Sequence, residues 1–299
     1  MSRHPIGILV YVPDNPIYLQ ELKQVETCVR LFLSNVADLI VCGPSSIQTK
    51  VHLPSIFVVH DTSLNIYYGY KFAHSLAILV NPVVQDLIRQ YDYILRTDTD
   101  VFLTSTLASI PRDGIFYTGR GEYCLNPQTR KNIRSVSARF HLYHRNRHNI
   151  GSTWYAPTEQ MLLLAPTLTY IMQWMASPNI VPKYVGWPTW HRGVIALYAS
   201  EIAINHHIPT VRISSEWFDT KSTSTLTRYP PHIHCWQTKN FYSKLMQYSY
   251  KKYNHPDTIQ KLQSKLQQHV LPVNEYCLLM YLLSKNDLKN KIYNKINIT

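Results

Sequence analysis

Long hydrophobic runs are absent from this sequence. The N-terminus offers only about seven apolar residues before Asp14, and no later segment approaches the roughly 18 to 20 apolar residues that cross a bilayer. We therefore expect no transmembrane segment and no Golgi-type anchor.

Cysteine is scarce and widely spaced. The five cysteines are odd in number, lie far apart and form no Cys-x-x-Cys pair. This spacing argues against a disulfide framework and against a zinc ribbon. It is typical of a reducing compartment, so we expect a soluble, intracellular protein of the cytoplasm.

Acidic residues are also few, with 18 Asp and Glu against 30 Lys and Arg and a net charge of +12. This excess favours an anionic partner, which could be a nucleoside diphosphate, a nucleic acid or an acidic membrane surface. Charge alone does not choose among these. A chain of 299 residues with 45% hydrophobic content can bury a large core, which argues against overall disorder.

Apolar runs alternate with helix-period segments along the first half of the chain. Strands are expected over residues 6–12, 39–42, 56–59 and 93–96. A helix is expected to begin at Pro16 with Asn15 as its cap, and further helical segments over 65–77 and 83–90. This alternation predicts an α/β domain with a largely parallel sheet, whose functional residues gather at the carboxyl ends of the strands.

The stretch 120–150 is strongly basic. It carries seven Arg and Lys against a single acid, Glu122, and also His141, His144 and His148 at helical spacings. We interpret it as a solvated long loop or irregular helix, in preference to a second metal site. Two further helices are expected near the C-terminus, one after Pro256 and one from residue 275.

The segment Tyr-Asp-Tyr-Ile-Leu-Arg-Thr-Asp-Thr-Asp-Val-Phe-Leu carries the clearest chemical signal. An apolar strand delivers two carboxylates, Asp98 and Asp100, to a turn, and they would repel each other unless a cation or Arg96 offset them. Mg²⁺ and Mn²⁺ favour such sites, with one or two carboxylates plus phosphate oxygens of a substrate. The motif therefore predicts a divalent metal site.

At this motif the sequence resembles the GT-A glycosyltransferases, whose Asp-x-Asp signature ends a central strand after a nucleotide-binding α/β half. The resemblance implies a Rossmann-like GT-A domain over 1–250, with a nucleotide-binding half at about 1–105 and an acceptor half at about 106–250. A C-terminal helical extension would cover 251–299. It also implies that Thr99, between the two acids, lies against the donor.

Other residues match the order of the family's motifs. Gly69-Tyr70-Lys71 resembles the segment that approaches the donor in retaining members, and residues 149–153 resemble an acceptor-side strand and loop. Glu201 falls where members carry an acid beside the reacting sugar. His234, which we favour over His232, resembles the late metal-binding His, and Lys239 follows it five residues later.

Two further donor-binding candidates lie at expected strand ends. Tyr11 ends the first strand and could stack on the base, while Asp61 follows the third. Lys71 and Lys239 would neutralise the leaving diphosphate. Each of these residues also has an ordinary interpretation, as a surface side chain or a core aromatic.

The resemblance implies transfer of a sugar from a UDP-sugar or GDP-sugar to a hydroxyl of a glycan or glycoconjugate, with Mn²⁺ or Mg²⁺ as cofactor. Glu201 would be the base of an inverting enzyme or would position the sugar in a retaining one, and the late His favours retention slightly. One alternative is a basic nucleic-acid-binding protein, although no specific nucleic-acid motif is present. The other is a metal-dependent phosphohydrolase, for which only Asp61 adds a second acidic strand end.

Overall fold

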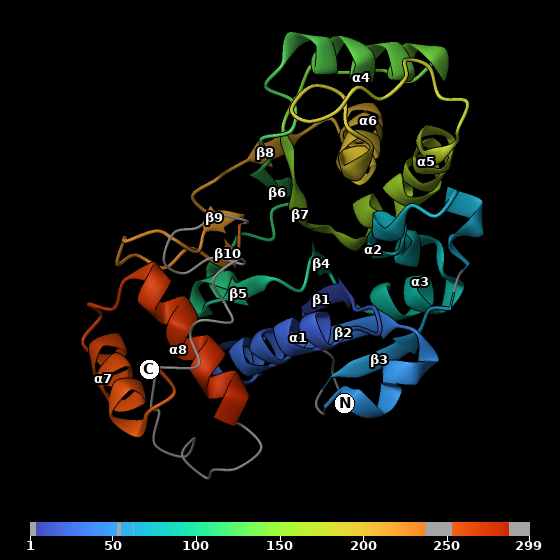
Figure 1. Ribbon diagram of the computed structural model, residues 1–299. Helices are drawn as coiled ribbons and strands as arrows, with labels where there is room; N and C mark the ends of the chain where they lie inside the picture. Colours follow the sequence, from blue (N-terminus) through green and yellow to red (C-terminus); the bar gives the residue numbers. More distant parts are fainter. Residues whose placement is uncertain (1–3, 53–54, 62, 237–252, 287–299) are drawn as a thin grey trace.

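The computed structural model describes residues 4–52, 55–61, 63–236 and 253–286. A seven-stranded sheet has the order β3-β2-β1-β4-β7-β6-β8, and a three-stranded sheet has the order β5-β10-β9 (Figure 1). The strands are β1 (Ile6–Tyr11), β2 (Ala37–Gly43), β3 (Ile56–Val59), β4 (Tyr93–Thr97), β5 (Val101–Leu103), β6 (Phe116–Arg120), β7 (Ile150–Pro157), β8 (Val211–Ile213), β9 (Thr220–Lys221) and β10 (His232–His234).

Helices cover both faces of the large sheet. They are α1 (Pro16–Cys28), α2 (His74–Ala77), α3 (Pro82–Ile88), α4 (Pro127–Arg139), α5 (Thr158–Ala176), α6 (Ile195–His207), α7 (Pro256–Gln267) and α8 (Val273–Asn286). A π-helical turn, Val29–Leu33, continues α1, and 3₁₀ turns cover Ser45–Lys50, Leu64–Tyr67, Lys71–Ala73, Ile78–Val80, Ser105–Ser109 and Arg192–Val194. None of the helices within the described ranges has both the length and the apolar character needed to cross a membrane.

The sheet is mixed but mostly parallel. Strands β3, β2, β1 and β4 run parallel to one another, β7 runs antiparallel to β4 and β6, and β6 pairs in parallel with β8. Alternate residues of β1 enter two apolar clusters: Ile8 and Val10 pack on the side of α1 and α8, while Leu9 packs on the side of α2, α5 and α6. The α/β fold with helices on both faces of the sheet is therefore confirmed.

Local signals placed the first helix correctly. The Asn15 side chain accepts a hydrogen bond from the Ile17 amide at 2.9 Å, and Pro16 takes the first helical position, where its missing N–H costs nothing.

The expected helix over 65–77 is broken. Tyr68 and Gly69 have positive φ angles of 49° and 73°, so the chain turns there and re-enters helical geometry only at Lys71. A left-handed residue ends a helix because its carbonyl and amide groups leave the helical direction.

The basic stretch was also interpreted incorrectly. It contains a regular helix, α4, whose first position is Pro127 and whose cap Asn126 accepts from the Gln128 amide at 2.8 Å. This is the same Asn-Pro start that marks α1, and the high charge of the segment obscured it.

The C-terminal helices α7 and α8 are present as predicted and pack on the side of α1. The Tyr276 hydroxyl on α8 donates to the Leu103 carbonyl of β5 at 2.6 Å, and Gln20 of α1 donates to the Ser284 hydroxyl at 3.2 Å. Buried residues of α8 belong to the same apolar cluster as β1 and β2.

Candidate functional site

The two acids of the motif lie in the turn that joins β4 to β5. Strand β10 runs antiparallel to β5 and places His234 opposite Val101, so the imidazole reaches the turn. His234 Nε2 lies 3.4 Å from Asp100 Oδ1. One ligand atom from each of Asp98, Asp100 and His234 lies within 4.8 Å of the other two. The structure thus brings together the three residues predicted to hold a metal.

Asp219, which the sequence analysis missed, lies on the side of the His234 ring that faces away from Asp100. Its Oδ1 lies 3.3 Å from His234 Nδ1 and accepts a hydrogen bond from the Thr153 hydroxyl at 2.7 Å. Burial alone raises the pKa of Asp219, but hydrogen bonding to His234 and the charges of His232 and His234 outweigh it and lower the pKa. A carboxylate in this position fixes the ring so that Nε2 faces the acids.

The position of Asp219 depends on two glycines in neighbouring strands. A Cβ atom would lie 2.0 Å from Asp219 Oδ2 at Gly119 and 2.3 Å from it at Gly151, so any other residue would displace the carboxylate. Gly119 also marks an irregularity in the pairing of β6 with β7. A glycine inside a strand often indicates close approach of another group. Gly119 and Gly151 were therefore the features of the sequence that could have indicated a buried group at this position.

His232, the weaker ligand candidate, has a different role. It is fully buried, its Nε2 lies 2.8 Å from the Thr97 hydroxyl, and its Nδ1 accepts from the Asp219 amide at 3.1 Å. Burial, more than the nearby charge of His234, lowers the pKa of His232 to about 4, against the opposing charge of Asp219. The ring is therefore neutral near pH 7 and links β4 to the Asp219 segment.

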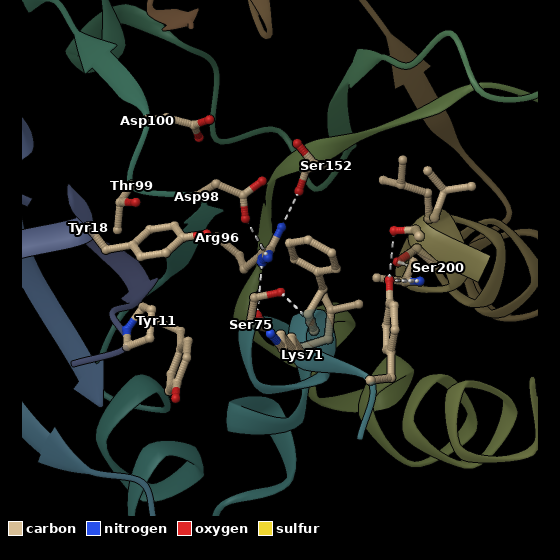
Figure 2. A pocket seen from close by; sticks show the side chains of 18 of the residues that line it. Tyr11, Tyr18, Lys71, Ser75, Arg96, Asp98, Thr99, Asp100, Ser152 and Ser200 are labelled. Atoms are coloured by element: carbon tan, nitrogen blue, oxygen red, sulfur yellow. Dashed lines mark hydrogen bonds and ion pairs between the residues drawn. The ribbon is translucent and has the colours of Figure 1, made fainter. Parts of the chain in front are cut away.

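The charges of the acidic turn are partly balanced. Burial alone lowers the pKa of His234, but the carboxylates of Asp100 and Asp219 outweigh it and raise the pKa well above the usual value. Arg96 is buried and pairs with Asp98 at 2.9 Å. Figure 2 shows this guanidinium held between Asp98 and the carbonyl groups of Ser75 and Ser152.

The acidic turn forms part of the wall of a cavity of about 320 Å³. The cavity opens beyond the carboxyl ends of β1 and β4, where ligands bind in open α/β sheets. Predicted site residues on its wall are Tyr11, Lys71, Asp98, Thr99, Asp100 and His234.

Two of the donor-binding candidates on this wall, Tyr11 and Thr99, also have partners within the chain. The Tyr11 ring stacks on His74 with centroids 5.0 Å apart, so only part of its surface faces the cavity. The Thr99 hydroxyl donates to the buried Glu21 carboxylate of α1 at 2.6 Å, which fixes the middle of the acidic turn. Lys71 is exposed at the cavity.

The remaining predicted residues lie elsewhere. Asp61 is exposed, accepts from the Ser45 amide at 3.2 Å and is not on the cavity wall. Lys239 lies outside the described residues. Glu201 is fully buried and does not line the cavity, although the preceding residue, Ser200, does, and the structure does not bring Glu201 to the acidic turn.

Comparison with known families adds one finding. The family described as "Domain of unknown function (DUF7164)" matches residues 17–296, which is almost the whole chain. The chain belongs to this family. A search among curated proteins gave no match.

Several arginines of the stretch 120–150 make internal contacts in this DUF7164 chain. Arg145 and Arg147 donate to main-chain carbonyls at the C-terminal end of α6, the former to His206 at 2.7 Å and the latter to Ile208 at 2.8 Å. Positive charge at a helix C-terminus interacts favourably with the unpaired carbonyl groups and the helix dipole. The guanidinium of Arg139 lies 5.4 Å from the Trp174 ring. Much of this basic charge therefore supports the fold.

Proposed function

We propose that this protein is a metal-dependent glycosyltransferase of the GT-A type, which transfers a sugar from a nucleoside-diphosphate sugar to an acceptor hydroxyl. The observation that carries the proposal is the convergence of Asp98, Asp100 and His234 within 4.8 Å on the wall of a cavity at the carboxyl end of β4. A nucleoside-diphosphate sugar supplies the further oxygen ligands that such a site needs.

The donor set fits a divalent ion. Two carboxylates and one imidazole suit Mn²⁺, and Mg²⁺ also accepts carboxylate oxygens. Asp219 supports the fit because it holds the ring of His234 from behind. A bound ion would neutralise negative charge on the departing diphosphate.

Different residues of the cavity wall are placed to contact different parts of the donor. Tyr11, at the end of β1, is placed for the base of a UDP-sugar or GDP-sugar, and the exposed ammonium group of Lys71 for the diphosphate. Thr99 acts indirectly, since its hydroxyl is bonded to Glu21 and keeps the turn in shape. The acceptor, a glycan or glycoconjugate, would enter from the open side.

Retention of the anomeric configuration is the better supported outcome. An inverting enzyme needs a base within hydrogen-bond reach of the acceptor hydroxyl. Among the described residues that line the cavity, the only carboxylates are Asp98 and Asp100, which we assign to the metal. In a retaining enzyme an oxygen of the leaving phosphate can accept that proton, so no further carboxylate is required.

The test is a thermal-shift screen of nucleotide sugars with and without Mn²⁺. A ligand that binds only the folded protein stabilises it by about 2.7 kcal/mol at a hundredfold excess over its dissociation constant. We expect a shift for one UDP-sugar or GDP-sugar that disappears in chelator. Absence of any shift, together with tight oligonucleotide binding at about 0.2 M salt, would overturn the proposal in favour of nucleic-acid binding.

A further inference from the structure

A second cluster of metal-binding side chains lies apart from the cavity. Cys124, His148 and Glu201 each place one ligand atom within 4.8 Å of the other two. Cys124 precedes α4, His148 precedes β7, and Glu201 belongs to α6. Figure 1 shows β7 and these two helices at the same end of the molecule.

One distance in this cluster matches a tetrahedral zinc site, and a second requires a small adjustment. Zinc bonds of about 2.0–2.3 Å at tetrahedral angles hold neighbouring ligand atoms about 3.3–3.7 Å apart. Cys124 Sγ lies 3.7 Å from His148 Nδ1. His148 Nδ1 lies 2.6 Å from Glu201 Oε1, which is a hydrogen bond that would lengthen by about 0.7 Å around an ion.

The Glu201 carboxylate is already oriented for such a role. The Tyr123 hydroxyl and the Asn149 amide donate to Oε2 at 2.7 and 2.9 Å. Both donors act on the same oxygen, so Oε1 is turned toward His148. Hydrogen bonds of this kind orient the first ligands of metal sites.

A fourth side chain, the imidazole of His144, lies close to the cluster. The His144 side chain is only 5% exposed, and its Nε2 lies 3.6 Å from Glu201 Oε1, beyond hydrogen-bond length. This nitrogen has no hydrogen-bond partner within the part of the chain that the structure describes. Buried polar atoms without a partner are rare and often mark an ion or water site.

We propose that Cys124 Sγ, His148 Nδ1 and Glu201 Oε1 bind a Zn²⁺ ion, with a water molecule as the fourth ligand of a tetrahedral site. Mixed sulfur, nitrogen and oxygen ligands suit Zn²⁺, whereas Mg²⁺ takes oxygen ligands. The thiol proton of Cys124 passes to solvent as the sulfur–zinc bond forms, and the His148 ring carries its proton on Nε2, so that Nδ1 can bind the ion. The ion joins the start of α4, the start of β7 and the middle of α6.

The protonation state of Cys124 does not prevent this. Burial, reinforced by the charge of Glu201, raises the pKa of the Cys124 thiol to about 12, while Arg130 and Arg134 act in the opposite direction. A coordinating Zn²⁺ ion deprotonates a thiol outright because its charge stabilises the thiolate.

The first test is the zinc content of the untagged full chain, produced in zinc-supplemented medium and measured by elemental analysis after gel filtration. We expect about one zinc per chain, and at least a tenfold lower content in Cys124→Ser and His148→Gln. The matched controls are Cys42→Ser, at a buried cysteine of β2, and His207→Gln, at a histidine bonded to Thr167. Both controls should keep the ion.

A double variant distinguishes zinc binding at this cluster from metal binding at the acidic turn. Asp98→Asn with Asp100→Asn removes the carboxylates of the proposed glycosyltransferase site but leaves the second cluster intact. Zinc content should be unchanged in that protein, whether or not the proposed activity exists. Loss of zinc there, with full content in Cys124→Ser, would overturn the proposal.

A measurement on the unmodified chain covers the case in which the variants fail to fold. Protein from which bound metal has been removed with a chelator is titrated with Co²⁺. Coordination by Cys124 is expected to give a near-ultraviolet charge-transfer band from thiolate to cobalt. Zn²⁺ should then displace the cobalt and abolish the band. Absence of both the band and stoichiometric zinc would show that the cluster is a hydrogen-bonded network only.

Discussion

The imidazole of His234 connects two carboxylates from different parts of the chain. Its Nδ1 lies 3.3 Å from Asp219 Oδ1, and its Nε2 lies 3.4 Å from Asp100 Oδ1. A histidine that binds metal through one nitrogen commonly has a carboxylate on the other. Asp219 therefore acts through His234 as a positioning residue.

We predict that Asp219→Asn weakens Mn²⁺ binding about 10- to 100-fold, because the amide accepts the His234 hydrogen bond less strongly than a carboxylate. Calorimetric titration of Mn²⁺ in the presence of UDP or GDP measures the effect. Thermal unfolding of the same protein is the control for general damage. Unchanged Mn²⁺ affinity would leave Asp219 with a structural role only.

The acidic turn itself should be essential. Asp98→Asn or Asp100→Asn is expected to reduce Mn²⁺-dependent hydrolysis or transfer of a nucleotide sugar by about 100-fold or more, a loss of about 2.7 kcal/mol in transition-state stabilisation. Asp61→Asn is the matched control, because Asp61 also follows a parallel strand but lies off the cavity wall. Full activity of both turn variants in chelator would contradict the assignment.

Glu201 should matter more for stability than for chemistry. It accepts hydrogen bonds from Tyr123 and from the Asn149 amide and does not line the cavity. We expect Glu201→Gln to lower the unfolding temperature, to leave donor affinity unchanged and to reduce turnover of the folded protein less than about tenfold, with retained product configuration. An inverted product with a loss of about a thousandfold would instead identify Glu201 as the general base.

The stability of the protein should depend on the ionisation of Glu26. Burial raises the pKa of this carboxyl from 4.5 to about 7, against hydrogen bonds from the His52 amide and the Ser55 hydroxyl. A pKa that is higher in the folded state stabilises the fold below about pH 4.5, and that stability is lost as the pH rises through about 7.

Glu26→Gln should therefore raise the free energy of unfolding at pH 8 by on the order of 2 kcal/mol and change it little at pH 4. Urea denaturation at the two pH values measures the difference. The exposed Glu216 provides the control variant, Glu216→Gln, which should behave like the parent at both. An equal effect of Glu26→Gln at pH 4 and pH 8 would exclude ionisation as its cause.

Short-range patterns predicted the sheet and the acidic turn well. The apolar runs expected over 6–12, 56–59 and 93–96 are strands β1, β3 and β4. A strand buried on both faces, such as β1 or β4, has a continuous apolar sequence. Asp98 and Asp100 come directly after such a run, so their position at the carboxyl edge of the sheet could be predicted from the sequence alone. His234 was added from its place in the order of motifs, and the pairing of β10 with β5 brings it to the same turn.

Tertiary contacts explain what the sequence did not reveal. Asp219 lies between short strands with no periodic pattern around it, and its role depends on the registers of β9 and β10. Glu201 was placed by sequence order alone, whereas its partners are Tyr123, which precedes α4, and His148 and Asn149, which precede β7. His148 in that segment is 11% exposed, so its interpretation as part of a solvated loop was wrong.

The pairing of β5 with β10 has a consequence for how the protein is made. His234 meets Val101 across this ladder, although they lie far apart in the sequence. Closing so long a loop costs entropy that is recovered only when both strands are in place. During synthesis the acidic turn leaves the ribosome before β10 does, so it has no imidazole beside it until residue 234 has emerged. The metal site that we propose would therefore be complete only in chains that include residue 234.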